Sequence, residues 1–246
     1  MTTGETRTRV ARRHALIAPD GHVPSTLPGV SGAIANVLIS PAMGADVTQL
    51  LLTFETDGHA EFRSNDIETF AYVMTGNCSV VVNGDGAELS EGGYVFAPAG
   101  QVLEISQPSP GTRITIFQKY YEEQEDVPGP APVIGNAAEV EGVPFLGDED
   151  ARLKTLLPDT PSFDMAVNLF TYQPGARLPF VETHVMEHGL IMLSGEGIYR
   201  LEESWYPVRA GDVIWMAPYC PQWFVAMGKE PASYLYYKDI NRSPIE

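Results

Sequence analysis

The sequence has few cysteines, few basic residues and no long hydrophobic run. Two cysteines among 246 residues cannot form a disulfide framework, so a reducing compartment is expected. Lysine and arginine number 15 against 32 aspartates and glutamates, and the net charge of −17 disfavours binding to nucleic acid or to anionic lipid. No apolar run could span a membrane, and the N-terminus lacks a secretion signal. We expect a soluble, cytoplasmic protein that binds a small molecule.

Apolar residues and turn residues are abundant. Hydrophobic residues form 44% of the chain, which suffices for one large or two modest domains. The 23 glycines and 20 prolines indicate many turns, and therefore short strands in preference to long helices.

The chain contains two copies of one segment. YVMTGNCSVVVNGDGAELSEGGYVFAPAG resembles IMLSGEGIYRLEESWYPVRAGDVIWMAPYC in its order of strands and turns. Gly76 and Gly195 correspond at an offset of 119 residues, whereas Pro98 and Pro218 correspond at 120. This repeat predicts two tandem antiparallel barrels or sandwiches.

Each copy contains short segments rich in Val, Ile, Phe, Tyr and Thr, which predict strands. They are TQLLLTF, AYVMTG, SVVVNG, GYVFAPA and TRITIFQKYY, then AVNLFTY, GLIMLSG, GIYRLE, DVIWMAP and SYLYYKD. The stretch QEDVPGPAPVIGNAAEVEGVPFLGDED is predicted to be a linker, and ARLKTLLP a short helix. We expect an N-terminal domain over residues 1–125, and a linker with a C-terminal domain over residues 126–246.

Two of the five histidines lie in PFVETHVMEHGLIML. Residues two apart on a strand share a side, so Glu182 and His184 are predicted to project together, and His188 begins the next strand. If these groups converge at a barrel mouth they suit a divalent metal; an exposed polar loop is the alternative. The matching positions in the first copy form no such set, which predicts a metal-free first domain. They are Arg63, Asn65, Thr69 and either Leu103 or Val102.

Lys238 ends the aromatic segment SYLYYKD, and alternation places Tyr234, Tyr236 and Lys238 on one face. Burial near a metal would lower the pKa of Lys238 and suit it to proton transfer or to holding a carboxylate. A structural lysine, whose aliphatic stem packs along the edge of the core, is an alternative of equal weight for Lys238. Lys119 has the matching position at an offset of 119, so a structural role stays open.

Aromatic residues and cysteines near these positions have two interpretations. Tyr199 and Trp215 either line the pocket or belong to the core, as do Trp205 and Trp223. Cys78 and Cys220 are predicted to be small packed residues, since a soft sulfur does not suit a set of oxygen and imidazole ligands.

The spacing from Glu182 to Gly195, followed by GDVIWMAPYCPQWF, resembles the cupin superfamily. In its first motif, H-x-H-(x)3-4-E-(x)6-G, Glu182 replaces the first histidine and His188 replaces the glutamate. Gln222 stands at the last histidine of the second motif. Two nitrogens and two oxygens favour Mn(II) or Fe(II) over Zn(II).

Nearly the whole chain resembles the (S)-ureidoglycine aminohydrolase family, whose members are bicupins that act in the breakdown of allantoin. The resemblance rests on RHALIAPDGHVPSTLPGV, ETHVMEHGLIMLSGEGIYRLEESWYPVRAGDVIWMAPYCPQWF and YLYYKDINRSP. It implies an all-β fold of two tandem double-stranded β-helix barrels. It also implies a hydrolase that replaces the amino group of ureidoglycine by hydroxyl. One Mn²⁺ per chain is implied, with the ligands Glu182, His184, His188 and Gln222.

The resemblance also implies substrate contacts from Tyr234 and Lys238. We interpret Glu182 as the base for the incoming water, and Lys238 as holding the substrate carboxylate or assisting the leaving ammonia. The expected substrate-binding set is Glu182, Gln222, Tyr234, Lys238 and Tyr199, and the expected assembly is a homo-oligomer. A cupin dioxygenase and a non-catalytic binding bicupin are the alternatives.

Overall fold

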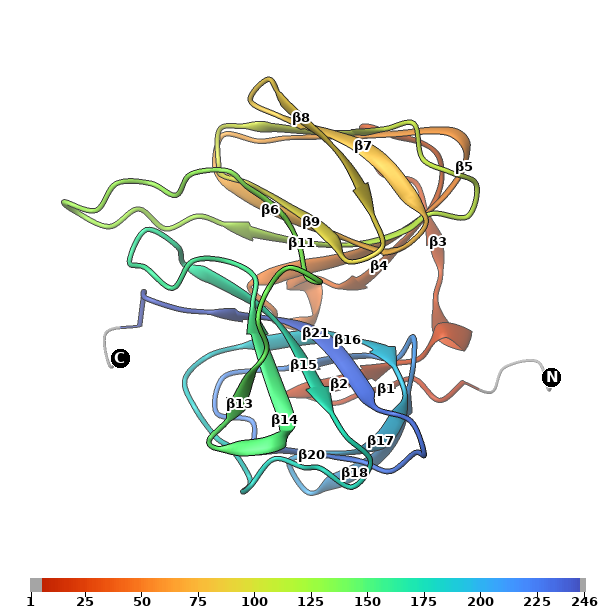
Figure 1. Cartoon of the computed structure of the whole chain (residues 1–246), viewed down its shortest axis with the longest axis vertical. Coiled ribbons are helices and arrows are strands. Elements are labelled where there is room, and N and C mark those ends of the chain that lie inside the picture. The colour runs from red at the N-terminus through yellow and green to blue at the C-terminus, as the bar shows by residue number, and fades with distance from the viewer. Residues whose placement is uncertain (1–5, 244–246) are drawn as a thin grey trace. The chain divides into compact units, whose positions relative to one another are not determined.

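The computed structural model describes residues 6–243, which are almost entirely strands and turns (Figure 1). They form two compact units. The N-terminal barrel unit comprises residues 23–140 and 160–164, and the C-terminal barrel unit comprises residues 6–22, 141–159 and 165–243 of the described range. This differs from the expected boundary after residue 125, because each segment belongs to the unit with whose strands it pairs and not to the unit that is nearest in the chain.

The N-terminal barrel unit is one antiparallel sheet in the order β12-β9-β6-β11-β5-β10-β7-β8, with β4 pairing β5 and β3 pairing β4. In β7 every second side chain, Cys78, Val80 and Val82, is buried in an aliphatic core, as the alternating sequence requires. The strands are β3 Pro24–Ser25, β4 Val30–Ile39, β5 Val47–Arg63, β6 Ile67–Thr75, β7 Asn77–Val82, β8 Asp85–Ser90, β9 Gly93–Ala97, β10 Val102–Ser106, β11 Arg113–Tyr120 and β12 Val133–Asn136.

The C-terminal barrel unit contains an eight-stranded sheet, β1-β2-β19-β16-β21-β15-β14-β13, and a three-stranded sheet, β18-β17-β20. All the pairings in both sheets are antiparallel. The strands are β1 Arg9–Val10, β2 His14–Ile17, β13 Val143–Phe145, β14 Asp148–Thr155, β15 Met165–Tyr172, β16 His188–Ser194, β17 Glu196–Leu201, β18 Ser204–Arg209, β19 Val213–Met216, β20 Gln222–Ala226 and β21 Ala232–Asp239.

The core of the C-terminal barrel unit is rich in aromatic residues, whereas that of the N-terminal barrel unit is mainly aliphatic, although it includes the buried ring of Phe54. The rings of Tyr172 and Phe224 meet edge to face at 5.0 Å, and those of Phe170 and Tyr172 stack at 4.3 Å. Several of the aromatic residues are tyrosines, so the interior carries hydroxyl groups as well as apolar surface. Such an interior can hold a polar ligand.

The segment predicted to be a linker forms strands β12 and β13 and the start of β14. The helix predicted for ARLKTLLP is also wrong, because its first five residues lie in β14. There Ala151 pairs with Tyr172 and Leu153 with Phe170 of β15. A short apolar run fits either structure, and the available sheet edge decides.

Within residues 6–243 there is no helix with the length and apolar character that crossing a lipid bilayer would require.

Candidate metal centre

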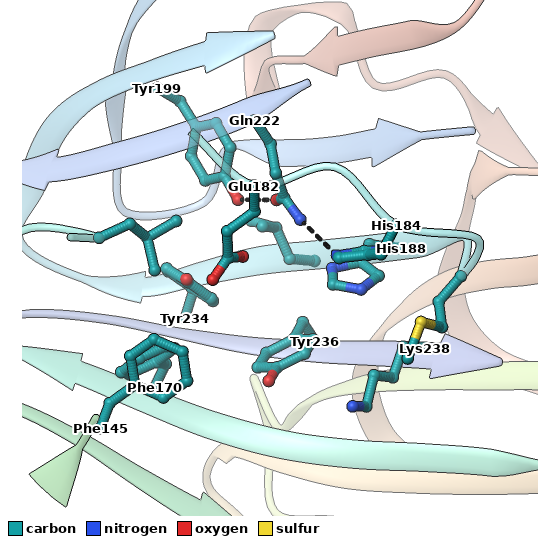
Figure 2. Close-up of a pocket in the computed structure, with 13 residues that line it drawn as sticks. Phe145, Phe170, Glu182, His184, His188, Tyr199, Gln222, Tyr234, Tyr236 and Lys238 are labelled. Atoms are coloured by element: carbon teal, nitrogen blue, oxygen red, sulfur yellow. Dashed lines mark hydrogen bonds between the residues drawn. The ribbon is translucent and has the colours of Figure 1, made fainter. Parts of the chain in front are cut away.

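A cavity of about 140 Å³ lies inside the C-terminal barrel unit (Figure 2). Its lining includes every residue that the sequence predicted as a metal ligand or a substrate contact. Its lining consists of Phe145, Phe170, Leu178, Glu182, His184, Met186, His188, Leu190, Tyr199, Gln222, Tyr234, Tyr236 and Lys238.

The two histidines form a stacked pair at one side of this cavity. His188 is the first residue of β16, opposite Lys238 on β21, and its ring lies 4.5 Å from that of His184. Burial lowers the pKa of His184, and lowers that of His188 well below its usual value, so both imidazoles are neutral at neutral pH. Within residues 6–243, His184 Nδ1 and His188 Nε2 are buried and have no hydrogen-bond partner.

Gln222 is held beside the pair from two directions. Its backbone exchanges hydrogen bonds of 2.8 and 2.9 Å with the backbone of Glu182. Tyr199 Oη donates to Gln222 Oε1 at 2.8 Å, and Gln222 Nε2 donates to His184 Nε2 at 3.1 Å (Figure 2). Tyr199 therefore fixes the orientation of the amide.

Glu182 lines the cavity but does not project together with His184. The strand predicted to carry both is absent; Glu182 makes only an isolated bridge to Gln222. Figure 2 shows its carboxylate on the side of Tyr234, apart from the imidazoles. Burial raises the pKa of Glu182, and the charge of Lys238 opposes this rise.

Strand β21 contributes Tyr234, Tyr236 and Lys238 to the cavity, the shared face that alternation predicted. Tyr234 Oη lies 3.0 Å from Tyr172 Oη, and burial raises the pKa of both phenols well above the usual value, so they remain neutral. Lys238 has no hydrogen-bond or ion-pair partner among residues 6–243.

Other aromatic predictions have mixed outcomes. Trp215 is buried but does not line the cavity; its strand neighbours Ile214 and Met216 are the ones that face the core. Trp205 is 56% exposed and meets Trp223 edge to face at 5.8 Å. Both cysteines are buried and free.

Sequence reasoning missed part of the apolar wall of the cavity. Phe170 could have been found, because alternation places it on the same face as Tyr172 in AVNLFTY. Phe145 could not, because it lies in the segment interpreted as a linker. Leu178 and Met186 lie outside the strands, and no sequence signal points to them.

Lys119 does not have the position that matches Lys238. On β11 it is Gln118 that lies opposite Thr69, as Lys238 lies opposite His188, and Gln118 Nε2 donates to Thr69 Oγ1 at 3.2 Å. Lys119 is on the alternate face, where Nζ donates to Asp164 Oδ2 at 2.6 Å and both side chains are buried. The sequence contained a signal for this: Pro98 and Pro218 are offset by 120 residues and not by 119. A shift of one residue moves a side chain to the other face of a strand, and an offset of 120 matches Lys238 with Gln118.

The remaining matching positions in the N-terminal barrel unit hold no ligand set. Arg63 and Asn65 are exposed, Thr69 accepts the hydrogen bond from Gln118, and Leu103 is in the aliphatic core.

The donor groups of the cavity fit a divalent metal ion by their chemistry. Two neutral imidazoles, an amide and a carboxylate line the same cavity, and His188 Nε2 has no partner among residues 6–243, whereas His184 Nε2 accepts from Gln222 Nε2. As the side chains stand, no three His, Cys, Asp or Glu groups in the described part of the chain are gathered closely enough to form a metal cluster. To complete a four-ligand set, the carboxylate of Glu182 has to turn toward the imidazoles. The Gln222 amide also has to turn, so that Oε1 replaces Nε2 on the imidazole side and Tyr199 Oη accepts from Nε2.

Comparison with known proteins agrees with this architecture. Residues 168–237 match the family pattern of the cupin domain. The (S)-ureidoglycine aminohydrolase of Escherichia coli strain K12 is 38% identical over 93% of this chain and 88% of its own length. The enzyme of the same name from Arabidopsis thaliana is 34% identical over 98% of this chain and 80% of its own. The crystal structure of protein Ylba from E. coli superposes with a TM-score of 0.87 at 35% identity, covering 97% of this chain and 96% of that one. The chain therefore belongs to the (S)-ureidoglycine aminohydrolase family of cupin hydrolases.

Proposed function

We propose that this hydrolase is a manganese-dependent (S)-ureidoglycine aminohydrolase, which releases ammonia from (S)-ureidoglycine and yields (S)-ureidoglycolate in allantoin catabolism. Similarity to the relatives over most of the chain supports this substrate. The observation that carries the proposal is the stacked pair of buried, neutral imidazoles, in one cavity with an amide, a carboxylate and Lys238. We also propose a cytoplasmic location, which the two free, buried thiols support.

His184, His188, Gln222 and Glu182 would hold the metal. Two nitrogen and two oxygen donors favour Mn²⁺ over Zn²⁺, and both imidazoles are already in the neutral form that binds metal. When bound, the ion supplies a Lewis acid to a substrate that carries a carboxylate, an amine and a ureido group on one carbon.

The cavity offers distinct groups to each part of this substrate. The Lys238 ammonium, which lacks a carboxylate partner in the described range, is available to bind the substrate carboxylate. Tyr199 and Tyr234 remain protonated because burial raises their pKa values. The Tyr234 hydroxyl can donate a hydrogen bond to ureido oxygen, and the Tyr199 hydroxyl, whose single O–H is bound to Gln222 Oε1 in this structure, can do so once that amide turns. These contacts would fix which face of the carbon meets the water, and hence the stereochemistry.

Glu182 is the base of the proposed reaction. Its raised pKa makes it a stronger base than a solvent-exposed carboxylate, and it takes a proton from water as the water oxygen bonds to the substrate carbon. The bond from that carbon to the amino nitrogen breaks. The proton held by Glu182 then passes to the departing nitrogen, which leaves as ammonia.

A cupin dioxygenase is the second candidate, because Glu182, His184 and His188 also have the donor types of an oxygen-activating iron site. The test is ammonia release from freshly generated ureidoglycine by Mn²⁺-loaded protein under anaerobic conditions, with the metal content measured on the same sample. We expect oxygen-independent ammonia release at one metal per chain. Turnover that requires oxygen, or no ammonia release, would refute the proposal.

A further inference from the structure

The N-terminal arm of the chain, residues 6–17, contacts a loop of the candidate metal centre. Strand β2 pairs with β19, so the arm extends the sheet that also contains β16 and His188. Residues 217–221 connect β19 to β20, whose first residue is Gln222. The arm therefore lies beside the segment that sets the position of Gln222.

Arg13 is the arm residue that contacts this segment. Its Nη2 donates to the Tyr219 carbonyl at 2.5 Å and to the Pro218 carbonyl at 3.4 Å, and its own carbonyl accepts from Ala217 N at 2.9 Å. Its Nη1 lies 3.5 Å from Glu202 Oε1. Arg12, the preceding residue, is exposed and has no hydrogen bond or ion pair within residues 6–243.

Tyr219 transmits the contact to the histidine side of the cavity. Its N–H donates to the His184 carbonyl at 2.7 Å, and its carbonyl accepts from Thr183 Oγ1 at 3.2 Å as well as from Arg13. Tyr219 has a φ of +60°, a conformation that a bulky residue keeps only when surrounding contacts hold it. Tyr219 is 48% exposed, so these backbone contacts contribute to holding its conformation.

We propose that Arg13 is a positioning residue of the metal centre. By binding the Tyr219 carbonyl it fixes the 217–221 segment, which determines where Gln222 begins β20 and supports the backbone of His184. The inference rests on the proposed metal site. It assigns to the N-terminal arm a function in the active site in addition to its strand pairing.

The test compares Arg13→Ala with Arg12→Ala, which removes the same charge from the same arm without removing a contact. Metal-free proteins are titrated with Mn²⁺, and amide hydrogen exchange is measured at Tyr219 and Gln222, whose N–H groups bond to His184 and Glu182. We expect Arg13→Ala to bind Mn²⁺ about tenfold more weakly, the effect of losing roughly one charge-assisted hydrogen bond. Both amides should exchange faster. Arg12→Ala should match wild type in both measurements.

Guanidinium ion at a sub-denaturing concentration provides the readout that separates positioning from general stability. It should restore Mn²⁺ affinity in Arg13→Ala and leave Arg12→Ala unchanged, while the two variants melt at similar temperatures. Arg13→Lys, which retains a charged donor, should lie between Arg13→Ala and wild type.

Three outcomes would overturn the proposal. They are an Mn²⁺ affinity of Arg13→Ala equal to that of Arg12→Ala, unchanged exchange at Tyr219, and a lowered melting temperature without rescue by guanidinium. Failure of the proposed function would be seen separately, as wild-type protein that binds no Mn²⁺ or releases no ammonia. In that case amide exchange at Tyr219 in the metal-free variants still decides whether Arg13 holds this segment.

Discussion

Lys238→Met removes the ammonium group from the cavity and keeps an unbranched side chain of similar length. Lys238 has no ion-pair partner among residues 6–243, so its replacement leaves no buried carboxylate unpaired. We therefore expect little change in melting temperature or in bound metal. Loss of a positioned acid or substrate-binding cation should reduce turnover by roughly 10²- to 10⁴-fold, or about 3–5.5 kcal/mol of transition-state stabilisation.

Lys119→Met is the matched variant, and its expected effect is the opposite. Lys119 is 5% exposed, and its Nζ lies 2.6 Å from Asp164 Oδ2, whose side chain is fully buried. Removing one partner of a buried ion pair costs about 3–5 kcal/mol, since the other charge stays in the protein interior. For a chain of this size that loss corresponds to a melting temperature lower by roughly 6–20 °C. Turnover per folded molecule should stay close to that of wild type.

The two variants are compared by ammonia release per folded molecule, by calorimetric melting and by metal content. A Lys238→Met enzyme with turnover within about threefold of wild type would remove Lys238 from the mechanism. A fall in melting temperature equal to that of Lys119→Met would show that Lys238 is structural.

Three further predictions concern the ligands. His184→Ala and His188→Ala should each lose bound Mn²⁺ on dialysis, as elemental analysis would show; a double variant that retains one metal per chain would contradict the site. Tyr199→Phe removes the hydroxyl that lies 2.8 Å from Gln222 Oε1 and that would accept from Nε2 when the amide turns its oxygen to the metal, so Mn²⁺ affinity should fall about tenfold in titrations while melting changes little; unchanged affinity would exclude this orienting role. Burial lowers the pKa of both histidines, so the unfolded chain binds more protons below about pH 6.5, and the metal-free protein should lose stability to urea as the pH falls through that value. The variant with both His184→Ala and His188→Ala should lack this loss of stability at low pH but retain the opposite contribution of Glu182, whose pKa is raised. If stability to urea changed with pH in parallel in the two proteins, the histidines would not be the source of the pH dependence.

The sequence by itself determined the repeat, most of the strands and the polar residues that line the cavity of the proposed metal site. Gly195, whose repeat partner is Gly76, has a φ of +71°, and a Cβ there would lie 2.5 Å from Ala232 Cα. Glycine is therefore required at this turn, which is why the repeat was visible. Alternation in SYLYYKD likewise placed Tyr234 and Lys238 on the face that lines the cavity. Turn geometry and strand alternation can be recognised in the sequence because each restricts the residue type at its own position.

Only the tertiary structure decided which strands are neighbours. Residues 6–22 belong to the C-terminal barrel unit because β2 pairs with β19, and Phe145 reaches the cavity because β13 pairs with β14. The finding that Gln118, and not Lys119, has the position matching Lys238 depends in the same way on the register between β6 and β11. A period of two shows which residues share a face. The partner strand and its register depend on hydrogen bonds and packing between residues far apart in the chain, and these leave no local pattern.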